Sequence, residues 1–110
     1  MQIHPLAYHL LQEARNAFAA AFGETPSLSL ITTYATNILS LYIAKHPNEL
    51  PQLPQWVEQP IPHFPRIPLN GKTAYKLTQL AEQLNISTNQ ALIIAAYLLL
   101  AILKQLPENI

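Results

Sequence analysis

Cysteine and aspartate are both absent from the 110-residue chain, and charged residues make up only 11% of it. Without cysteine there is no disulfide framework, no thiolate nucleophile and no cysteine-ligated zinc site. Six lysines and arginines balance six glutamates, so the formal net charge is zero. Because neutral molecules repel one another only weakly, this composition favours association with a partner.

Apolar residues make up half of the sequence, which is enough to build the core of one small domain. The longest apolar run, residues 91–103, would span about 20 Å as a helix and is too short for the ~30 Å core of a bilayer. Residues 1–22 have neither the basic start nor the cleavage site of a signal peptide. We therefore expect a cytoplasmic protein that does not enter a membrane.

Helical periodicity predicts two helices in the first 46 residues. The first begins at Pro5, a residue favoured in the first helical turn, and ends at Gly23, which can adopt a left-handed cap. The second follows Ser27 and continues to about His46. The expected apolar side chains are Leu6, Leu10, Ala14, Phe18 and Phe22 in the first helix, and Leu28, Ile31, Tyr34, Ala35, Ile38, Leu41 and Tyr42 in the second.

Seven of the ten prolines fall within residues 47–68. Each proline fixes its own φ angle and favours an extended residue before it, so this stretch predicts a stiff connector. A ligand for an aromatic groove is the alternative, but the prolines lack a repeated PxxP register with a basic flank. We expect the connector to lie over the helices, anchored by Leu53, Trp56, Val57, Ile61 and Phe64.

The third predicted helix, residues 73–84, is amphipathic. Its apolar side chains recur three and four residues apart, so they share one face of the helix. The apolar face holds Leu77, Leu80, Ala81 and Leu84, and the polar face holds Lys72, Lys76, Gln79, Glu82 and Gln83. We expect the first face to pack on the core and the second to meet solvent.

After a turn at Asn85-Ile86, a fourth helix is predicted from Thr88 to about Leu106. Ser87 is a favoured N-cap residue, and Gln90 three positions later completes a capping box. Almost every residue from 92 to 103 is apolar, so this helix has no polar face. Such a helix must be covered on all sides. We expect the N-terminal helices and a second copy of the chain to cover it together.

The motifs of common enzymes and metal sites are missing. Gly71-Lys72-Thr73 is similar to the end of a phosphate-binding loop, but Arg66 occupies the position of the required first glycine. Asn70-Gly71 is therefore interpreted as a turn. The four histidines form no metal-binding motif, and no serine lies in a nucleophile elbow. We expect no catalytic residue, no metal and no cofactor.

The C-terminal region resembles the ribbon-helix-helix family of DNA-binding proteins. The residues that carry the resemblance are Arg66-Ile67-Pro68-Leu69, Leu77, Leu80-Ala81, Leu84, Ile86-Ser87 and Ala91-Leu92. In that family two chains pair their strands in the major groove of DNA. The resemblance implies DNA contacts by Arg66, Asn70, Lys72, Lys76, Ser87, Thr88 and Asn89. It also implies a dimer or partner interface at Ile67, Leu69, Leu92, Ile93, Leu99 and Leu100.

Two other resemblances involve the same residues. The run Leu80-Ala81-Glu82-Gln83-Leu84-Asn85-Ile86-Ser87 is similar to the first half of a helix-turn-helix, which would make residues 88–100 the recognition helix. Residues 77–110 are similar to an internal segment of peptide-synthetase condensation domains. That likeness implies shared helix packing without activity, because the His-His motif of those enzymes is absent.

Together these observations predict an all-α fold in three parts. Residues 1–46 form a helical hairpin, residues 47–65 a proline-rich connector packed on the same domain, and residues 66–110 a ribbon-helix-helix-like module with a short strand. The expected function is a small dimeric DNA-binding regulator of the repressor or antitoxin type. The alternative is a non-enzymatic assembly subunit or adaptor that docks on a partner protein through its apolar helices.

Overall fold

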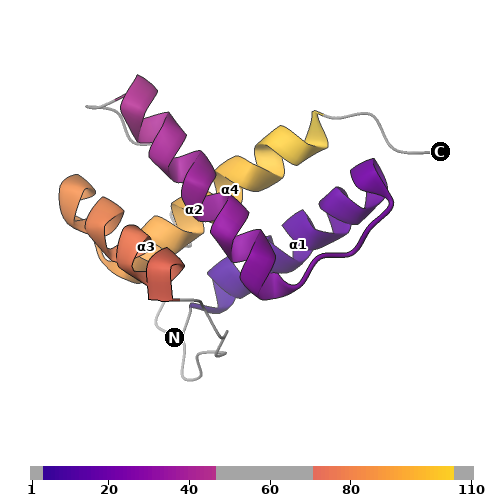
Figure 1. The fold of residues 1–110 in the computed structure, drawn as a ribbon, viewed down its shortest axis with the longest axis horizontal. Coiled ribbons are helices and arrows are strands. Elements are labelled where there is room, and N and C mark those ends of the chain that lie inside the picture. The colour runs from indigo at the N-terminus through magenta and orange to yellow at the C-terminus, as the bar shows by residue number, and fades with distance from the viewer. Residues whose placement is uncertain (1–3, 47–70, 106–110) are drawn as a thin grey trace.

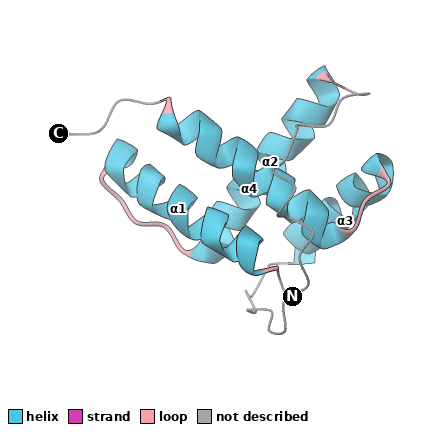
Figure 2. Cartoon of the chain, turned by 180° about the vertical axis from the view of Figure 1, so that it is seen from behind, coloured by secondary structure: helices cyan, strands magenta, loops and turns pink. Residues whose placement is uncertain are grey.

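The computed structural model describes residues 4–46 and 71–105. Within these ranges it contains four helices, α1 (Pro5–Phe22), α2 (Leu28–Lys45), α3 (Gly71–Leu84) and α4 (Thr88–Lys104), and no strand (Figure 2). The all-α class is therefore confirmed for this part of the chain. The short strand expected within residues 66–70 and the proline-rich connector over residues 47–65 lie outside the described residues.

The N-terminal helices begin and end at the residues that their local signals predicted. The Nδ1 atom of His4 caps α1 by accepting a hydrogen bond from the Leu6 amide at 3.1 Å. At the other end Gly23 has a φ angle of 74°, and its amide donates to the Ala19 carbonyl at 2.8 Å. Ser27 caps α2 through its Oγ, which accepts from the Leu30 amide at 3.1 Å.

The capping box at the start of α4 is also present as predicted. The Ser87 Oγ accepts from the Gln90 amide at 3.1 Å, and the Ser87 amide donates to the Gln90 Oε1 at 3.0 Å. Asn85, with a φ angle of 57°, reverses the chain between α3 and α4. These short-range bonds satisfy amide groups that a helix start leaves without acceptors.

Two predicted helix ends need correction. Helix α3 begins at Gly71 instead of residue 73, and Asn70, the other residue of the predicted turn, lies outside the described residues. Glycine weakens a helix mainly in its interior, and this one stands at the first position. Helix α4 ends at Lys104, two residues before the expected Leu106, where the Gln105 amide donates to the Ile102 carbonyl at 3.1 Å and tightens the last turn.

Helix α4 is the central element of the fold, and it packs against all three other helices (Figure 1). Its contacts with α1 and α2 are more extensive than the contacts between α1 and α2 themselves. Residues 91–96 at its N-terminal half are all buried. The expectation that the N-terminal helices cover the apolar fourth helix is therefore correct for this half.

The buried face of α2 differs from the predicted one. Ile31 and Ala35 are buried as expected, but Leu41 is 60% exposed. The other predicted side chains, Leu28, Tyr34, Ile38 and Tyr42, are only half buried. Their place in the core is taken by Thr32, Thr36, Leu39 and Ile43.

The two threonines can be buried because α2 itself satisfies their hydroxyl groups. Thr32 Oγ1 donates to the Leu28 carbonyl at 2.7 Å, and Thr36 Oγ1 donates to the Thr32 carbonyl at 2.8 Å. With the hydroxyl donors bonded inside the helix, burial leaves no donor without an acceptor. On α1 the predicted stripe is buried from Leu6 to Ala14, whereas Phe22 at its end is 53% exposed.

In the described part of the chain, no single helix has the length and hydropathy of a membrane span. Helices α3 and α4 reach that length and composition only as a pair, and the pair is bent by 100° at the turn between them.

Candidate functional site

The second half of α4 is less enclosed than the first. Helices α2 and α4 cross near their middles and then diverge, so their C-terminal halves form the two arms of an open V (Figure 1). Tyr97 is 39% exposed and Ile102 is 42% exposed on this half of α4. The described chain therefore leaves apolar side chains of its most apolar helix in contact with solvent.

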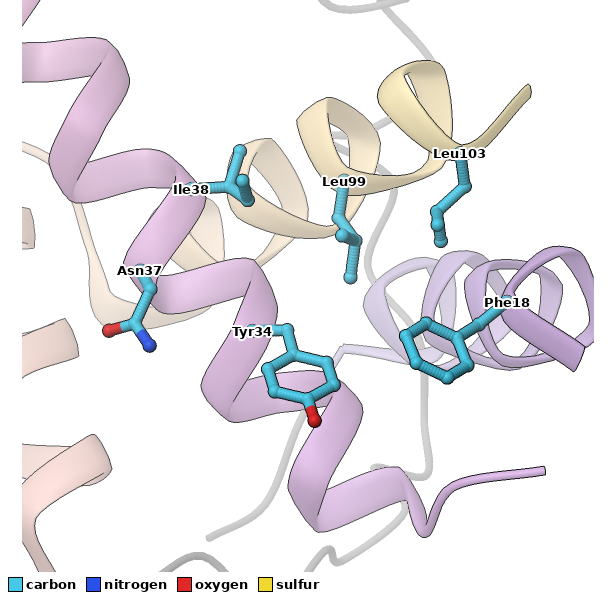
Figure 3. A pocket seen from close by; sticks show the side chains of 6 residues that line it. All are labelled: Phe18, Tyr34, Asn37, Ile38, Leu99 and Leu103. Carbon is cyan, nitrogen blue, oxygen red and sulfur yellow. The ribbon is translucent and has the colours of Figure 1, made fainter. Parts of the chain in front are cut away.

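An apolar hollow of about 310 Å³ lies where α1, α2 and α4 meet. Leu99 and Leu103 point into it from α4, and the rings of Phe18 and Tyr34 lie on its opposite side (Figure 3). These two rings are stacked, with centroids 5.7 Å apart. Asn37 and Ile38 complete the lining. Since Tyr34 and Asn37 provide the only polar atoms among the lining side chains, the hollow suits an apolar occupant.

A second hollow of about 210 Å³ lies inside the V, between the ends of α2 and α4. Its lining residues are Ile38, Leu41, Tyr42, Lys45, His46, Leu98 and Ile102. Because Ile38 lines both hollows, we name the two together the α2–α4 groove. Lys45 brings a positive charge to one end of this groove, where the rings of Tyr42 and His46 are 4.7 Å apart.

A third hollow, also of about 210 Å³, lies between α2 and α3 and has a different chemistry. It is lined by Thr33, Thr36, Asn37, Lys72, Thr73 and Lys76, and we name it the lysine pocket. Lys76 Nζ donates to the Asn37 Oδ1 at 2.9 Å, and the hydroxyl oxygens of Thr33 and Thr73 lie 3.0 Å apart. Figure 3 shows the Asn37 amide directed away from the apolar side chains of the first hollow.

The structure brings together two of the residues predicted to contact DNA. Lys72 and Lys76 lie in the same pocket, against side chains of α2 that the family resemblance did not include. The pocket could be found only from the fold, because Asn37 and Lys76 are 39 positions apart in the sequence. Arg66 and Asn70, the other two predicted contacts before α3, lie outside the described residues.

The remaining predicted DNA contacts, Ser87, Thr88 and Asn89, lie at the start of α4, and Ser87 and Asn89 make hydrogen bonds within the chain. Ser87 caps the helix, as described above. The Asn89 Oδ1 accepts a hydrogen bond from the His4 amide at 2.9 Å, which ties the start of α1 to the start of α4. This helix start is therefore occupied by the protein's own groups in the present structure.

The predicted interface residues on α4 belong to the core of a single chain. Leu92, Ile93, Leu99 and Leu100 are each at most 6% exposed. Ile67 and Leu69 lie outside the described residues. In the hollow between the ends of α2 and α4, the apolar side chains that solvent reaches are the exposed Leu41 and Ile102, and Leu98 there is half buried. The sequence did not predict these residues as interface residues. For Leu98 and Ile102, the lack of a polar face on the fourth helix was a signal that some of its apolar side chains would be exposed.

Groups that could support metal binding are not gathered in the described ranges. Residues 4–46 and 71–105 contain no group of three or more metal-ligating side chains placed to hold an ion. His9 Nε2 and Glu13 Oε1 lie 3.2 Å apart on the exposed side of α1. Neither residue lines the two apolar hollows or the lysine pocket.

Comparisons with known proteins assign no family to this chain. No protein-family model, no curated protein and no solved structure matches the chain. The functions of the groove and of the lysine pocket therefore have to be inferred from their own residues and geometry.

Proposed function

We propose that this chain is a non-enzymatic adaptor or assembly subunit that binds a helical segment of a partner protein in the α2–α4 groove. The observation that carries the proposal is the pair of apolar hollows that share Ile38, with the exposed Leu41 and Ile102 among the lining residues. Exposed apolar surface gathered around a groove is typical of protein-binding sites. Burying a whole leucine or isoleucine side chain contributes about 1.5–3 kcal/mol.

A helix is the occupant that the surrounding elements suit best. The groove lies between two diverging helices, and the ridge of side chains on a third helix can pack between them. Residues 91–96 in the N-terminal half of α4 are all buried, whereas Tyr97 and Ile102 in its C-terminal half are exposed. A partner helix would offer apolar side chains at positions i, i+3 or i+4, and i+7.

Charge indicates the chemistry of the partner. Lys45 and His46 line one end of the groove, and none of its lining residues is acidic. A partner helix with a glutamate or aspartate beside its apolar face would therefore complement the groove. If two copies paired groove to groove, their described residues would bring no carboxylate to Lys45, because Glu13, Glu24 and Glu82 lie outside the groove lining.

The experiment uses a designed amphipathic peptide of about 14 residues, with leucines on one face and two glutamates beside them. Isotope-labelled protein is titrated with the peptide, and backbone amide shifts are followed by NMR. We expect saturable shifts at groove residues, and loss of binding in the variant Ile102→Glu. The matched control is Tyr75→Glu, which adds the same charge at an exposed aromatic residue of α3 outside the groove.

Two further peptides test whether binding depends on the apolar face and on the charge of the peptide. A peptide with the same composition but scattered leucines should not bind, and one with lysines in place of glutamates should bind more weakly. Equal binding to wild type and Ile102→Glu would rule out the groove. Sedimentation velocity of the protein alone, over a wide concentration range, distinguishes a homodimer, which the family resemblance implies, from a chain that awaits a different protein.

DNA binding by a small dimeric regulator is the second candidate function, and the lysine pocket favours it. Helices α3 and α4 carry three lysines against Glu82 alone, and two of the lysines share the pocket. Fluorescence anisotropy with labelled non-specific duplex DNA tests this candidate. Each phosphate contact adds about 0.9 to the log–log slope of affinity against salt. The variant Lys72→Gln/Lys76→Gln should therefore bind with a shallower slope, and absence of binding at low salt would exclude the candidate.

A further inference from the structure

The threonine hydroxyl groups that line the lysine pocket are bonded to other groups of the protein. Thr36 Oγ1 donates to the Thr32 carbonyl and Thr33 Oγ1 donates to the Ser29 carbonyl, at 2.8 and 3.1 Å. The contact between Thr33 and Thr73 links α2 to α3. These bonds fix the threonine side chains that line the pocket, so the two lysines border a hollow whose shape is already formed without a ligand.

The groups that remain to meet a ligand are donors. Lys76 uses its ammonium group on the Asn37 Oδ1, which leaves two further N–H donors on Lys76 and the Nδ2 group of Asn37. Lys72 adds a second ammonium group to the lining, and no carboxylate is among the lining residues. Since like charges four residues apart on a helix repel each other, an anion placed between Lys72 and Lys76 would relieve that repulsion.

The start of α3 strengthens the positive potential of this pocket. The helix begins at Gly71, so Lys72 and Thr73 belong to its first turn, and that turn contains no acidic residue. Amide groups of a first turn have no acceptor within the helix, and the helix dipole is positive at this end. The first turn of α3 and the two ammonium groups therefore both make the electrostatic potential in the lysine pocket more positive.

We propose that the lysine pocket binds a phosphate group. A phosphate offers several acceptor oxygens and up to two negative charges, which match two ammonium groups and an amide donor better than a single carboxylate does. The hollow of about 210 Å³ has room for this group. The phosphate can come from a free ion or from a nucleic-acid backbone. This site is separate from the α2–α4 groove and does not depend on the adaptor function.

The experiment titrates isotope-labelled full-length protein with inorganic phosphate at constant ionic strength, with chloride as the exchanged anion. We expect saturable NMR shifts of the Lys72, Thr73 and Lys76 amides and of the Asn37 side-chain amide. The variant Lys72→Gln/Lys76→Gln should bind phosphate about tenfold more weakly or worse. The control Lys104→Gln removes one lysine charge at the end of α4, outside this pocket, and should respond like wild type.

Two outcomes would overturn the proposal. One is a set of shifts no larger with phosphate than with chloride, and the other is an unchanged response in Lys72→Gln/Lys76→Gln. Circular dichroism confirms that each variant is folded, and the single variant Lys72→Gln, which keeps the Lys76–Asn37 bond, should give an intermediate affinity. If a short duplex DNA shifts the same resonances and phosphate competes with it, the backbone is the source. If only the free ion shifts them, the site takes small phosphates.

Discussion

Gly23 and Gly71 are the two glycines of the chain, and they have different backbone requirements. Gly23 ends α1 with a φ angle of 74°, a conformation that is strained for residues with a Cβ atom. Gly71 is the first residue of α3, and a Cβ atom added there would have no described atom within 4 Å other than those of its chain neighbours and its own helix backbone. The same substitution should therefore have opposite effects at the two sites.

We predict that Gly23→Ala lowers the free energy of unfolding by roughly 1–2 kcal/mol, because alanine must adopt the left-handed conformation. Gly71→Ala should leave it unchanged or raise it by about 0.4–1 kcal/mol, because alanine restricts the unfolded chain. Urea unfolding followed by circular dichroism measures both changes. Equal destabilisation by the two substitutions would contradict the backbone conformations described here.

At the scale of a single helix, local signals and tertiary packing contribute separately. The ends of α1 and α4 depend on bonds between residues two to four positions apart, such as the contact between Ser87 and Gln90. The buried face of α2 depends on its neighbours. Apolar residues occur all around α2, so the periodicity did not decide between the faces that contain Leu41 and Leu39. The threonine hydroxyls bonded within the helix allowed the less apolar face to be buried.

The capping box of α4 provides a prediction at this scale. Ser87→Ala removes the acceptor of the Gln90 amide and should lower the free energy of unfolding by about 1 kcal/mol. Ser87→Asp keeps an acceptor at the same position and should cost far less. Urea unfolding of the two variants beside wild type measures the difference. If Ser87→Ala is as stable as Ser87→Asp, the capping bond does not contribute to stability.

At the scale of the whole molecule, the way in which the helices cross decides where the two apolar hollows lie. One lies where α1, α2 and α4 meet. The other lies between the ends of α2 and α4, which diverge (Figure 1). Neither helix carries the groove alone, since Leu41 and Tyr42 come from one and Leu98 and Ile102 from the other. The angle between helices far apart in the sequence therefore decides which apolar residues meet solvent. This exposed apolar surface should also bind an apolar fluorescent dye.

We predict that the folded chain binds the fluorescent dye anilinonaphthalene sulfonate in the α2–α4 groove, because its aromatic rings suit an apolar hollow and its sulfonate can approach Lys45. Ile102→Glu should reduce the fluorescence increase strongly. Tyr75→Glu, with the same added charge outside the groove, should leave it nearly unchanged. A similar signal from both variants would place the dye elsewhere on the surface.

Sequence alone determined the all-helical class and the helix ends in the described ranges to within two residues. Pro5, Gly23, Ser27 and the Ser87–Gln90 pair act through neighbours in the chain, so their effect can be recognised without the fold. It also identified Lys72 and Lys76 as a basic pair.

Only the tertiary structure decided which apolar residues form the core and which line a groove. Leu92 and Ile102 are similar in the sequence, but the first is fully buried and the second is 42% exposed, on the half of α4 that diverges from α2. The pairing of Lys76 with Asn37 also required the fold. Burial and long-range contacts depend on how helices far apart in the chain cross, and local residue patterns do not contain that angle.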